Sequence, residues 1–342
     1  MWAGAVQYFR CPSCRGGGGV TLEAAILEGP AGQIKEGRLA CPACRRSYEI
    51  RNYIHHFVTG ESYASSFGFE WNVHARTQLD KFSGRPITRD RFRETTRWPE
   101  NLNGQRVLEA GCGAGRFSEV VLDAGAELFS FDLSSAVDAN LANNGMRENF
   151  TLFQASVYDV PLEEETFDKV FCLGVLQHTP DVKGAFLNLV RFVKPGGQIA
   201  VDVYRRTRRT PFIPKYLLRP LTKRLPKSML YRACRLLVPV LSPLRAAVYR
   251  IPVIGYYLHL LLPIACYRES LSSLAERLTR EQIREWEILD TFDMYSPEYD
   301  NPQMLEAVRA WCEEAGLCDI FVRPGPNGIN ATATRPPHAA TC

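Results

Sequence analysis

The sequence VLEAGCGAGRF, residues 107–117, sets Gly111, Gly113 and Gly115 at alternate positions directly after a short apolar run. Glycine accepts backbone conformations that other residues avoid, and without a Cβ atom it lets the backbone come close to a bound molecule. In open parallel sheets, ligands bind where such a loop leaves the carboxyl end of a strand. The loop therefore predicts a ligand site, and the residues around it decide which ligand fits.

A pyrophosphate or phosphate ligand fits this loop poorly. The dinucleotide pattern requires Gly-x-Gly-x-x-Gly with an acid about twenty residues further on. Gly111, Gly113 and Asp132 satisfy part of it, but position 116 is arginine. The carboxylate of Glu109 would repel a pyrophosphate, whereas it could accept hydrogen bonds from an ammonium group. No Gly-Lys-Ser/Thr follows the loop, which excludes a P-loop.

Short apolar runs alternate with longer amphipathic segments over residues 104–203. The runs expected to be strands are 106–109, 127–132, 151–154, 167–173 and 198–203. Segments 115–124 and 181–193 have helical patterns, and VKPGGQ at 193–198 is typical of a helix end and a turn. This alternation predicts an α/β fold of Rossmann-like, doubly wound type, with helices on both faces of a parallel sheet.

Four blocks of this region, taken in order, resemble the class I S-adenosylmethionine-dependent methyltransferases. They are VLEAGCGAGRF, LFSFDLS at 128–134, QASVYDVPLEEETFDKVFCLGVLQHTPD at 154–181 and FVKPGGQIAVDVY at 192–204. The resemblance implies a seven-stranded methyltransferase sheet, S-adenosyl-L-methionine as the cofactor, and methyl transfer as the activity. It also implies a role for residues at matching positions.

The resemblance implies a cofactor-binding set. Its members are Glu109, Ala110, Gly111, Cys112, Gly113, Asp132, Leu133, Ser156, Val157, Leu173 and Gly174. Residues 109–113 would hold the methionine part, Asp132 the ribose hydroxyls, and Leu133 one face of the adenine. Residues 156–157 would frame the adenine edge, and residues 173–174 would lie beside the sulfonium. Many family members have aspartate at position 156, so the serine here would bind the adenine amino group more weakly.

Two Cys-x-x-Cys pairs, Cys11 with Cys14 and Cys41 with Cys44, stand near the N-terminus. Four thiolates converging from two such turns form the tetrahedral set that Zn²⁺ prefers. A unit of under about fifty residues has little core of its own, so a metal would supply stability. Redox-active dithiols are the alternative. Because all four ligands are protein groups, the predicted zinc is structural rather than catalytic.

The stretch LACPACRRSYEIRNYIHHF, residues 39–57, resembles the small zinc-ribbon proteins that activate tRNA methyltransferases. The resemblance covers residues 8–58. It implies a zinc ribbon with a short strand and a turn after the second cysteine pair. His55 and His56 follow that strand, and with four cysteines present we expect them to have a structural or substrate-side role rather than to bind the metal.

Residues just after the fourth core strand are expected to face the methyl acceptor. Gln177 and His178 stand there, in LGVLQHTPD. Histidine exchanges protons near neutral pH, so His178 is the candidate catalytic base for a hydroxyl acceptor. Alternatively, it orders the loop before Pro180. Asp202 and Tyr204, at the end of the fifth strand, are weaker candidates.

Two further segments are expected near the acceptor. The stretch SYASSFGFEWNVHARTQLD, residues 62–80, crowds aromatic residues ahead of the glycine loop, and it either caps the cofactor or packs between ribbon and core. DTFDMYSPEYD, residues 290–300, gathers acids and tyrosines. It either folds back toward the acceptor pocket or forms a capped loop.

A basic insert follows the fifth strand. Residues 205–270 contain fourteen Lys or Arg and one acid, Glu269, although the whole chain carries a net charge of only +4. Four interpretations stand: contact with an anionic membrane through residues 204–270, RNA backbone binding, a lid over an anionic small substrate, and plain structural packing. The many large aliphatic residues make RNA the weaker interpretation.

The chain is predicted to divide into six parts. They are a zinc ribbon (8–58), a helical cap or linker (59–103), the cofactor-binding core (104–203), the basic helical insert or lid (204–285), the C-terminal part of the core (286–332) and a disordered tail (333–342). Residues 301–317 are expected to contain an amphipathic helix that ends at Gly316.

Composition favours a soluble, cytoplasmic protein. Eleven cysteines without an N-terminal signal pattern fit a reducing compartment and metal binding better than a disulfide framework. The longest uncharged stretch, 251–267, is broken by Pro252, Gly255 and Pro263, which disfavours a membrane span. A peripheral membrane position through the insert stays open.

The functional prediction is a methyltransferase for a small-molecule or glycan-like acceptor, acting by in-line methyl transfer and most simply on oxygen. The first alternative is an rRNA or tRNA base methyltransferase, because a four-cysteine ribbon ahead of a methyltransferase domain also resembles the bacterial rRNA guanine methyltransferases. Those enzymes lack a large insert after the fifth strand. The second alternative is a non-catalytic scaffold that binds the cofactor.

Overall fold

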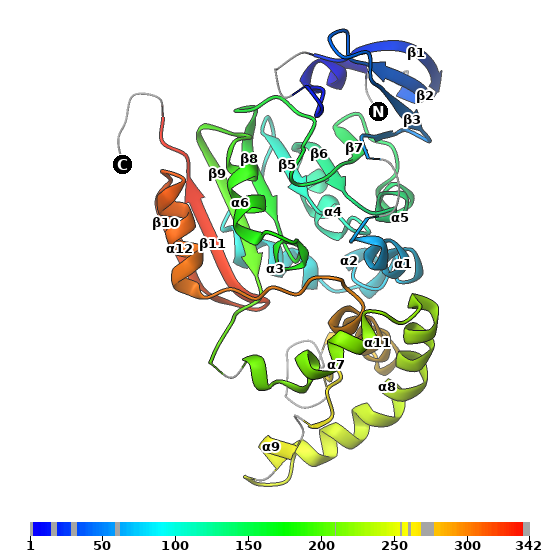
Figure 1. Cartoon of the computed structure of the whole chain (residues 1–342), viewed down its shortest axis with the longest axis vertical. Coiled ribbons are helices and arrows are strands. Elements are labelled where there is room, and N and C mark those ends of the chain that lie inside the picture. The colour runs from blue at the N-terminus through cyan, green and yellow to red at the C-terminus, as the bar shows by residue number, and fades with distance from the viewer. Residues whose placement is uncertain are drawn as a thin grey trace.

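The computed structural model describes residues 3–14, 19–28, 33–58, 62–208, 210–253, 255–258, 261–267 and 277–337. Across these residues, the strands form one eleven-stranded sheet in the order β1-β2-β3-β4-β7-β6-β5-β8-β9-β11-β10 (Figure 1). The first four strands belong to the cysteine-rich N-terminal unit, and the other seven belong to the predicted core.

Five parallel strands form the centre of the sheet. They are β5 (Arg106–Ala110), β6 (Glu127–Asp132), β7 (Phe150–Gln154), β8 (Phe167–Cys172) and β9 (Val193–Val203). Neighbouring residues of one strand, such as Val107 and Leu108, are both fully buried, because helices cover both faces. Two antiparallel strands, β11 (Gly328–Thr334) and β10 (Cys318–Gly325), complete the seven. The predicted Rossmann-like α/β fold is confirmed.

Two separate apolar cores lie on the two faces of this sheet. Helices α4 (Arg116–Asp123) and α5 (Ala136–Asn144) pack on one face, where Val107 and Phe171 point. Helices α6 (Val182–Val190) and α12 (Leu305–Glu314) pack on the other, where Leu108 and Val170 point. The alternation of side chains along each strand produces this division.

The segment VKPGGQ differs from expectation. Its sequence predicts a helix end and a turn, but β9 begins at Val193 and includes it. Val193 pairs with Phe167 whereas Gln198 pairs with Lys169, so the strand bulges between these two pairings. Gly196 has a φ of +79°, which glycine adopts without strain, and this explains why the sequence has the local pattern of a turn.

Three helices occupy the region between ribbon and core: α1 (Ser65–Val73), α2 (Asp80–Ser83) and α3 (Ile87–Thr96). Helix α3 packs against α4 through Phe92, whose ring meets the rings of Trp98, Phe117 and Phe171. The region is therefore firmly attached to the core.

The N-terminal unit contains a 3₁₀ turn and four strands: η1 (Ala3–Tyr8), β1 (Thr21–Glu28), β2 (Gln33–Ala40), β3 (Ser47–Arg51) and β4 (Ile54–His56). Strand β4 pairs in parallel with β7, the edge of the core sheet, with His55 opposite Phe153. The sheet therefore continues beyond the seven strands that were expected. The reason is that β4 presents backbone groups to an otherwise open edge, as in the hydrogen bond from Phe57 N to Gln154 O at 2.9 Å.

The insert after β9 is helical. It contains the short η3 (Thr210–Phe212), then α7 (Pro214–Thr222), α8 (Lys227–Tyr249) and α9 (Gly255–Leu258). These helices lie at the end of the molecule opposite the N-terminal unit (Figure 1). Helix α8 packs its buried residues, Leu230 and Val238 among them, against Ile288 and Phe292 of α11 (Arg280–Tyr295).

Two predicted segment boundaries differ from those in the structure. The insert was expected to end at residue 285, yet α11 runs unbroken through that position, because Thr279 and Gln282 form a capping box that starts the helix earlier. The tail was expected to begin at residue 333, yet β11 continues to Thr334, where it pairs with Gln198. Residues 338–342 of that tail lie outside the described residues. None of the helices in the described ranges is long and apolar enough to span a membrane.

Candidate functional site

A cavity of about 440 Å³ lies where β5, β6, β8 and β9 end. Its walls come from the glycine loop, the loops after β6, β7 and β8, helix α1 and helix α11. Ligands of open α/β sheets bind at this edge, so the fold places the cavity where the glycine loop predicted a site.

The glycine loop is shaped by contacts that exclude side chains. Gly111 has a φ of +77°, and a Cβ atom there would lie 2.3 Å from a methyl carbon of Val175. Gly113 has a φ of +51°, and a Cβ atom there would lie 3.1 Å from the indole nitrogen of Trp71. The amides of Gly111 and Cys112 donate to Phe131 O at 2.7 and 3.0 Å, which fixes the loop to β6.

Asp132 ends β6 and lines the cavity beside this loop. Its Oδ2 accepts from Gly113 N at 3.0 Å, and its Oδ1 accepts from Ser134 N at 2.8 Å and Ser134 Oγ at 2.7 Å. Burial raises the pKa of the Asp132 carboxyl, while these hydrogen bonds act in the opposite direction. Leu133, the next residue, also lines the cavity.

Glu109 is enclosed in protein and does not line the cavity. Ser118 Oγ and Ser130 Oγ donate to its Oε2 at 2.5 and 2.7 Å, whereas its Oε1 is buried and has no hydrogen-bond partner among the residues that the structure describes. Burial raises the pKa of the Glu109 carboxyl to about 7. Ser156, expected at the adenine edge, also lies off the cavity, and its Oγ accepts from Tyr158 N at 3.2 Å.

A pair of arginines lies beside the loop after β8. Arg91 of α3 donates to Asp202 Oδ2 at 2.7 Å, and Asp202 Oδ1 accepts from Gly174 N at 2.5 Å. A Cβ atom at Gly174 would lie 3.7 Å from the Arg91 guanidinium and 3.9 Å from that of Arg116. Arg116 donates to Gln78, and burial lowers the pKa of its guanidinium to about 9. Two cationic groups thus face one part of the cavity wall.

His178 lies in the short 3₁₀ turn η2 (Leu176–His178) after β8 and lines the cavity. Its Nδ1 lies 3.0 Å from Tyr299 O, and since a carbonyl only accepts, Nδ1 carries the proton. Its Nε2 is 3.9 Å from Asp293 Oδ1. Asp293 also accepts from Tyr204 OH at 3.0 Å, and the Tyr204 ring meets His178 edge to face.

Carboxyl groups from two distant helices line the same cavity as His178. Glu70 of α1 is only 1% exposed, lines the cavity and has no hydrogen-bond partner on either oxygen among the described residues. Burial, with Asp293 and Asp290 nearby, raises the pKa of the Glu70 carboxyl well above its ordinary value. Burial also raises the pKa of Asp290 to about 6, and Tyr267 OH donates to that carboxyl.

The aromatic segment before the glycine loop was expected to cap the cofactor or to pack between ribbon and core; in the structure one part of it lines the cavity and another part packs on the insert rather than on the ribbon. Tyr63, Phe67 and Trp71 line the cavity. Phe69 points away and packs against Tyr231 of α8 and Phe292 of α11. The segment therefore forms part of the cavity wall and also joins it to the insert.

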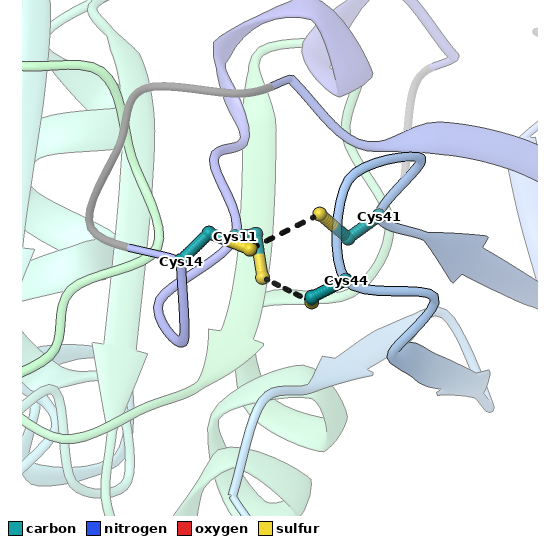
Figure 2. A group of neighbouring side chains, drawn as sticks. All are labelled: Cys11, Cys14, Cys41 and Cys44. Carbon is teal, nitrogen blue, oxygen red and sulfur yellow. Dashed lines mark hydrogen bonds between the residues drawn. The ribbon is translucent and has the colours of Figure 1, made fainter.

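The four predicted metal ligands come together in the N-terminal unit (Figure 2). The ligand atoms of Cys11, Cys14, Cys41 and Cys44 all lie within 4.8 Å of one another. The Sγ atoms of Cys11 and Cys44 are 3.7 Å apart, and those of Cys14 and Cys41 are 3.6 Å apart. A tetrahedral zinc with Zn–S bonds of about 2.3 Å separates its sulfurs by about 3.8 Å, so the donor set fits Zn²⁺.

The backbone around Cys41 supports the same assignment. The backbone N–H groups of Cys44 and Ala43 point at the Cys41 sulfur and lower the pKa of its thiol to about 7. His55 is fully buried, stacks on Phe9 at 4.9 Å and lies 3.4 Å from Leu152 O, while His56 contacts Gln154 at 2.8 Å. Both histidines join the ribbon to β7, which is the structural role.

Comparison with known protein families gives two matches. A family model described as a methyltransferase domain matches residues 108–201, and one described as Trm112p-like protein matches residues 10–52. The chain carries a methyltransferase domain. A Trm112p-like domain precedes it, and the matched ranges coincide with the cavity-forming core and the cysteine cluster.

Curated relatives match a little under a third of the chain. The ubiquinone biosynthesis O-methyltransferase of Pseudomonas fluorescens (strain SBW25) is 33% identical over 109 residues, which is 31% of this chain and 47% of that protein. Its namesake in Alkalilimnicola ehrlichii is 35% identical over 108 residues, or 31% of this chain and 44% of that protein. The chain thus spans about half the length of these relatives.

Solved structures resemble the chain at lower identity. Phosphoethanolamine N-methyltransferase 2 of Haemonchus contortus, in complex with S-adenosyl-L-methionine, has a TM-score of 0.42 at 14% identity, covering 81% of this chain and 58% of that one. A complex of the Haloferax volcanii Trm112 methyltransferase activator with a methyltransferase has a TM-score of 0.42 at 10% identity, covering 82% and 100%.

Most of the residues expected to bind the cofactor line the cavity of the methyltransferase domain. They are Gly111, Cys112, Gly113, Asp132, Leu133, Val157, Leu173 and Gly174. Glu109, Ala110 and Ser156 do not line it. Ala110 is buried in the sheet, and Glu109 points into the packed layer between β5 and α4.

Sequence reasoning missed several polar residues of the cavity, among them Glu70, Gln78, Arg91, Arg116 and Tyr267. Arg116 had a signal, because it directly follows the third glycine and begins α4. The others come from the helical cap and the insert, where no motif marks them.

Proposed function

We propose that this protein is an S-adenosylmethionine-dependent methyltransferase that methylates a hydroxyl group of a small-molecule or glycan-like acceptor. The observation that carries the proposal is the cavity itself. It joins the glycine loop and Asp132 of the methyltransferase domain to His178, Tyr204 and Asp293 at one site. The residues proposed to bind the cofactor and the residue proposed to take the proton therefore line one cavity.

The residues present fit the proposed cofactor. Arg91 and Arg116 supply cationic groups for its carboxylate, next to Gly174. Asp132 lies at the end of β6, where its remaining acceptor positions can receive the ribose hydroxyls. Leu133 and Val157 offer apolar contacts for the adenine. When bound, the cofactor supplies an activated methyl group on a sulfonium, and the protein mainly has to align the acceptor with it.

His178 is the proposed general base. Its Nδ1–H is committed to Tyr299 O, so Nε2 is the atom that can take a proton from an acceptor hydroxyl. Asp293, 3.9 Å from Nε2, would stabilise the imidazolium formed in this step. Tyr204 holds that carboxylate in place by donating to its other oxygen.

Glu109 would act on the loop rather than on the ligand. Its hydrogen bonds with Ser118 and Ser130 tie the end of β5 to α4 and β6, directly beneath Gly111. The expected contact between Glu109 and the ammonium group would require its unpaired Oε1 to reach the ligand, and that oxygen is enclosed by protein. We therefore assign Glu109 a positioning role.

Two measurements test the proposal. Calorimetry should detect binding of S-adenosylmethionine and of its demethylated product to the zinc-loaded protein; absence of heat with both would refute the cofactor assignment. His178→Asn should lower kcat roughly 10²- to 10⁴-fold with little change in cofactor affinity. An unchanged kcat would show that His178 only orders the loop before Pro180.

The acceptor class is decided by turnover of methyl-labelled cofactor in a cell extract that is then separated into RNA, protein, lipid and small-molecule fractions. Label in the small-molecule or glycan fraction is the expected result. Label in RNA would favour the RNA methyltransferase alternative, which the Trm112p-like domain keeps in view. Cofactor binding without label in any fraction would favour the scaffold. The four clustered thiols favour a reducing compartment such as the cytoplasm, so the assays should be run under reducing conditions.

A further inference from the structure

Helix α7 buries its charged side and exposes its apolar side, which is the reverse of an ordinary surface helix. Its buried residues are Lys215 and Arg219, whereas Leu217, Leu218 and Leu221 face the solvent. Leu217 is 72% exposed and Leu221 is 67% exposed. A helix on a globular protein normally buries its apolar stripe and exposes its charges.

The inward polar contacts of α7 explain why it keeps this orientation. Lys215 forms an ion pair with Asp300, whose side chain is fully buried. Arg219 donates to Met294 O at 2.9 Å and Pro297 O at 2.8 Å, which satisfies the carbonyl groups at the end of α11. Because the charged side of the helix is anchored in this way, the leucine side faces outward.

Helix α8 also exposes apolar side chains, although its buried side is apolar rather than charged. Its buried side, which includes Leu230, Cys234 and Val238, packs against α11. Its exposed side is apolar as well: Met229, Leu236, Val240 and Leu244 follow at intervals of seven, four and four residues, which places them on one side of the helix. We call the exposed residues Leu217, Leu218, Leu221, Met229, Leu236, Val240 and Leu244 the outward face.

Apolar exposure is concentrated in this part of the molecule. Among the described residues, thirteen of the twenty large apolar side chains that are exposed lie between positions 213 and 261. Isolated exposed apolar residues are normal, but a concentration of this kind marks an interaction surface.

The charge of the same segment selects the partner. Residues 204–267 contain thirteen Lys or Arg and no acid. Arg224, Arg232, Arg235 and Arg250 of this segment are exposed. A second copy of the chain would bring two such positive segments together, and an RNA backbone would leave the leucines in water. Anionic phospholipid offers both an apolar interior and negative headgroups.

We propose that the outward face docks on an anionic lipid bilayer, with its leucines entering the headgroup and acyl boundary and its arginines contacting the headgroups. The surface is coupled to the cavity, because α11 packs α8 on one side and contributes Asp290 and Asp293 to the cavity on the other. Docking would bring the cavity to the bilayer. This proposal does not depend on the methyltransferase activity.

The test is sedimentation of the full, zinc-loaded chain with vesicles of phosphatidylcholine alone or with about one third phosphatidylglycerol. Binding to the anionic vesicles, weakened by salt, is the expected result. The double variant Leu217→Ser with Leu221→Ser should bind at least roughly tenfold more weakly, because each leucine loses its transfer into lipid. Arg224→Gln and Arg232→Gln should each weaken binding roughly fivefold.

The matched control is Ile26→Ser with Leu27→Ser on β1, which removes two exposed apolar side chains, 62% and 58% exposed, from the opposite end of the molecule. It should bind like the unchanged protein, and thermal melting should show that every variant is folded. Equal binding to both vesicle types, or full binding by the leucine variant, would overturn the proposal. So would a dimer in solution that only the leucine variant dissociates, or salt-sensitive RNA binding without vesicle binding.

Discussion

The carboxyl group of Glu109 is enclosed at the end of β5, where two serines donate to one of its oxygens and the other oxygen has no hydrogen-bond partner in the described part of the chain. Burial raises its pKa to about 7, from an ordinary value of 4.5. The folded state thus binds this proton more tightly than the unfolded chain does. Stability should therefore fall as pH rises from about 4.5 to about 7 and level off above that.

Glu109→Gln tests whether stability falls with rising pH because of this carboxyl group. The variant lacks the titration, so its free energy of unfolding relative to the unchanged protein should rise by up to about 3 kcal/mol between pH 5 and pH 8. Urea unfolding at the two pH values measures the difference, and comparing the two proteins cancels the pH dependence of the cysteine cluster. A constant difference would mean that Glu109 titrates normally in the fold.

At the scale of elements, α7 is held by one buried acid. Asp300 meets Lys215 directly, and Arg219 approaches its Oδ2 to 3.8 Å. Asp300→Ala would leave two buried cations without a carboxylate. We expect a loss of about 3 kcal/mol in unfolding free energy, or local detachment of α7 that protease digestion would reveal.

The control for that prediction is Glu298→Ala, which removes the carboxylate of an exposed pair with Lys223 at 2.8 Å. Exposed pairs contribute little, so its stability should change by less than about 1 kcal/mol. Similar losses of unfolding free energy from both variants would show that the burial of Asp300 adds nothing to the stability of the ion pair.

Helix α7 also shows a limit of pattern analysis. Its sequence alternates cations and leucines as any amphipathic helix would, and the usual rule would bury the leucine side, whereas the structure buries Lys215 and Arg219. The choice is made by the carbonyl groups at the end of α11 and by Asp300, which lie more than seventy residues further along the chain. Local sequence could therefore predict a basic helical insert but not its outward face.

At the scale of the whole molecule, ribbon and core share one sheet, and most buried apolar residues of the ribbon belong to the apolar core on one face of that sheet. Phe9 of the ribbon meets Phe153 of β7 at 5.4 Å, and β4 pairs with β7 along the sheet edge. Metal binding energy is therefore coupled to the stability of the entire chain.

Removal of zinc by a chelator should lower the melting temperature of the whole protein by roughly 10 °C or more, in a single transition. Cys41→Ser should have the same effect, whereas Cys318→Ser, on β10 and outside the cluster, should not. Calorimetry with metal analysis measures both. If protein shown to be metal-free melted at an unchanged temperature, the stability of the core would not depend on metal binding by the ribbon.

Residues close together in the chain allowed much of the site to be predicted. The glycine loop, Asp132 and the four cysteines could be identified because a tight turn or a metal knuckle needs particular residue types at fixed short spacings. The parallel strands could be predicted for the same reason, since their apolar runs and turns are local. Even so, the pattern around Gly196 predicts a turn where the strand has a bulge, because a positive φ is compatible with both.

The sequence by itself thus determined the Rossmann-like sheet, the cysteine cluster and the loop that begins the cavity, because backbone geometry and metal ligation are local requirements. Tertiary structure alone decided that Glu109 stays off the cavity and that β4 extends the sheet. It also decided that Glu70 of α1 and Asp290 and Asp293 of α11 line the same cavity as His178. These outcomes depend on which distant segments pack together, and no spacing within one segment encodes them.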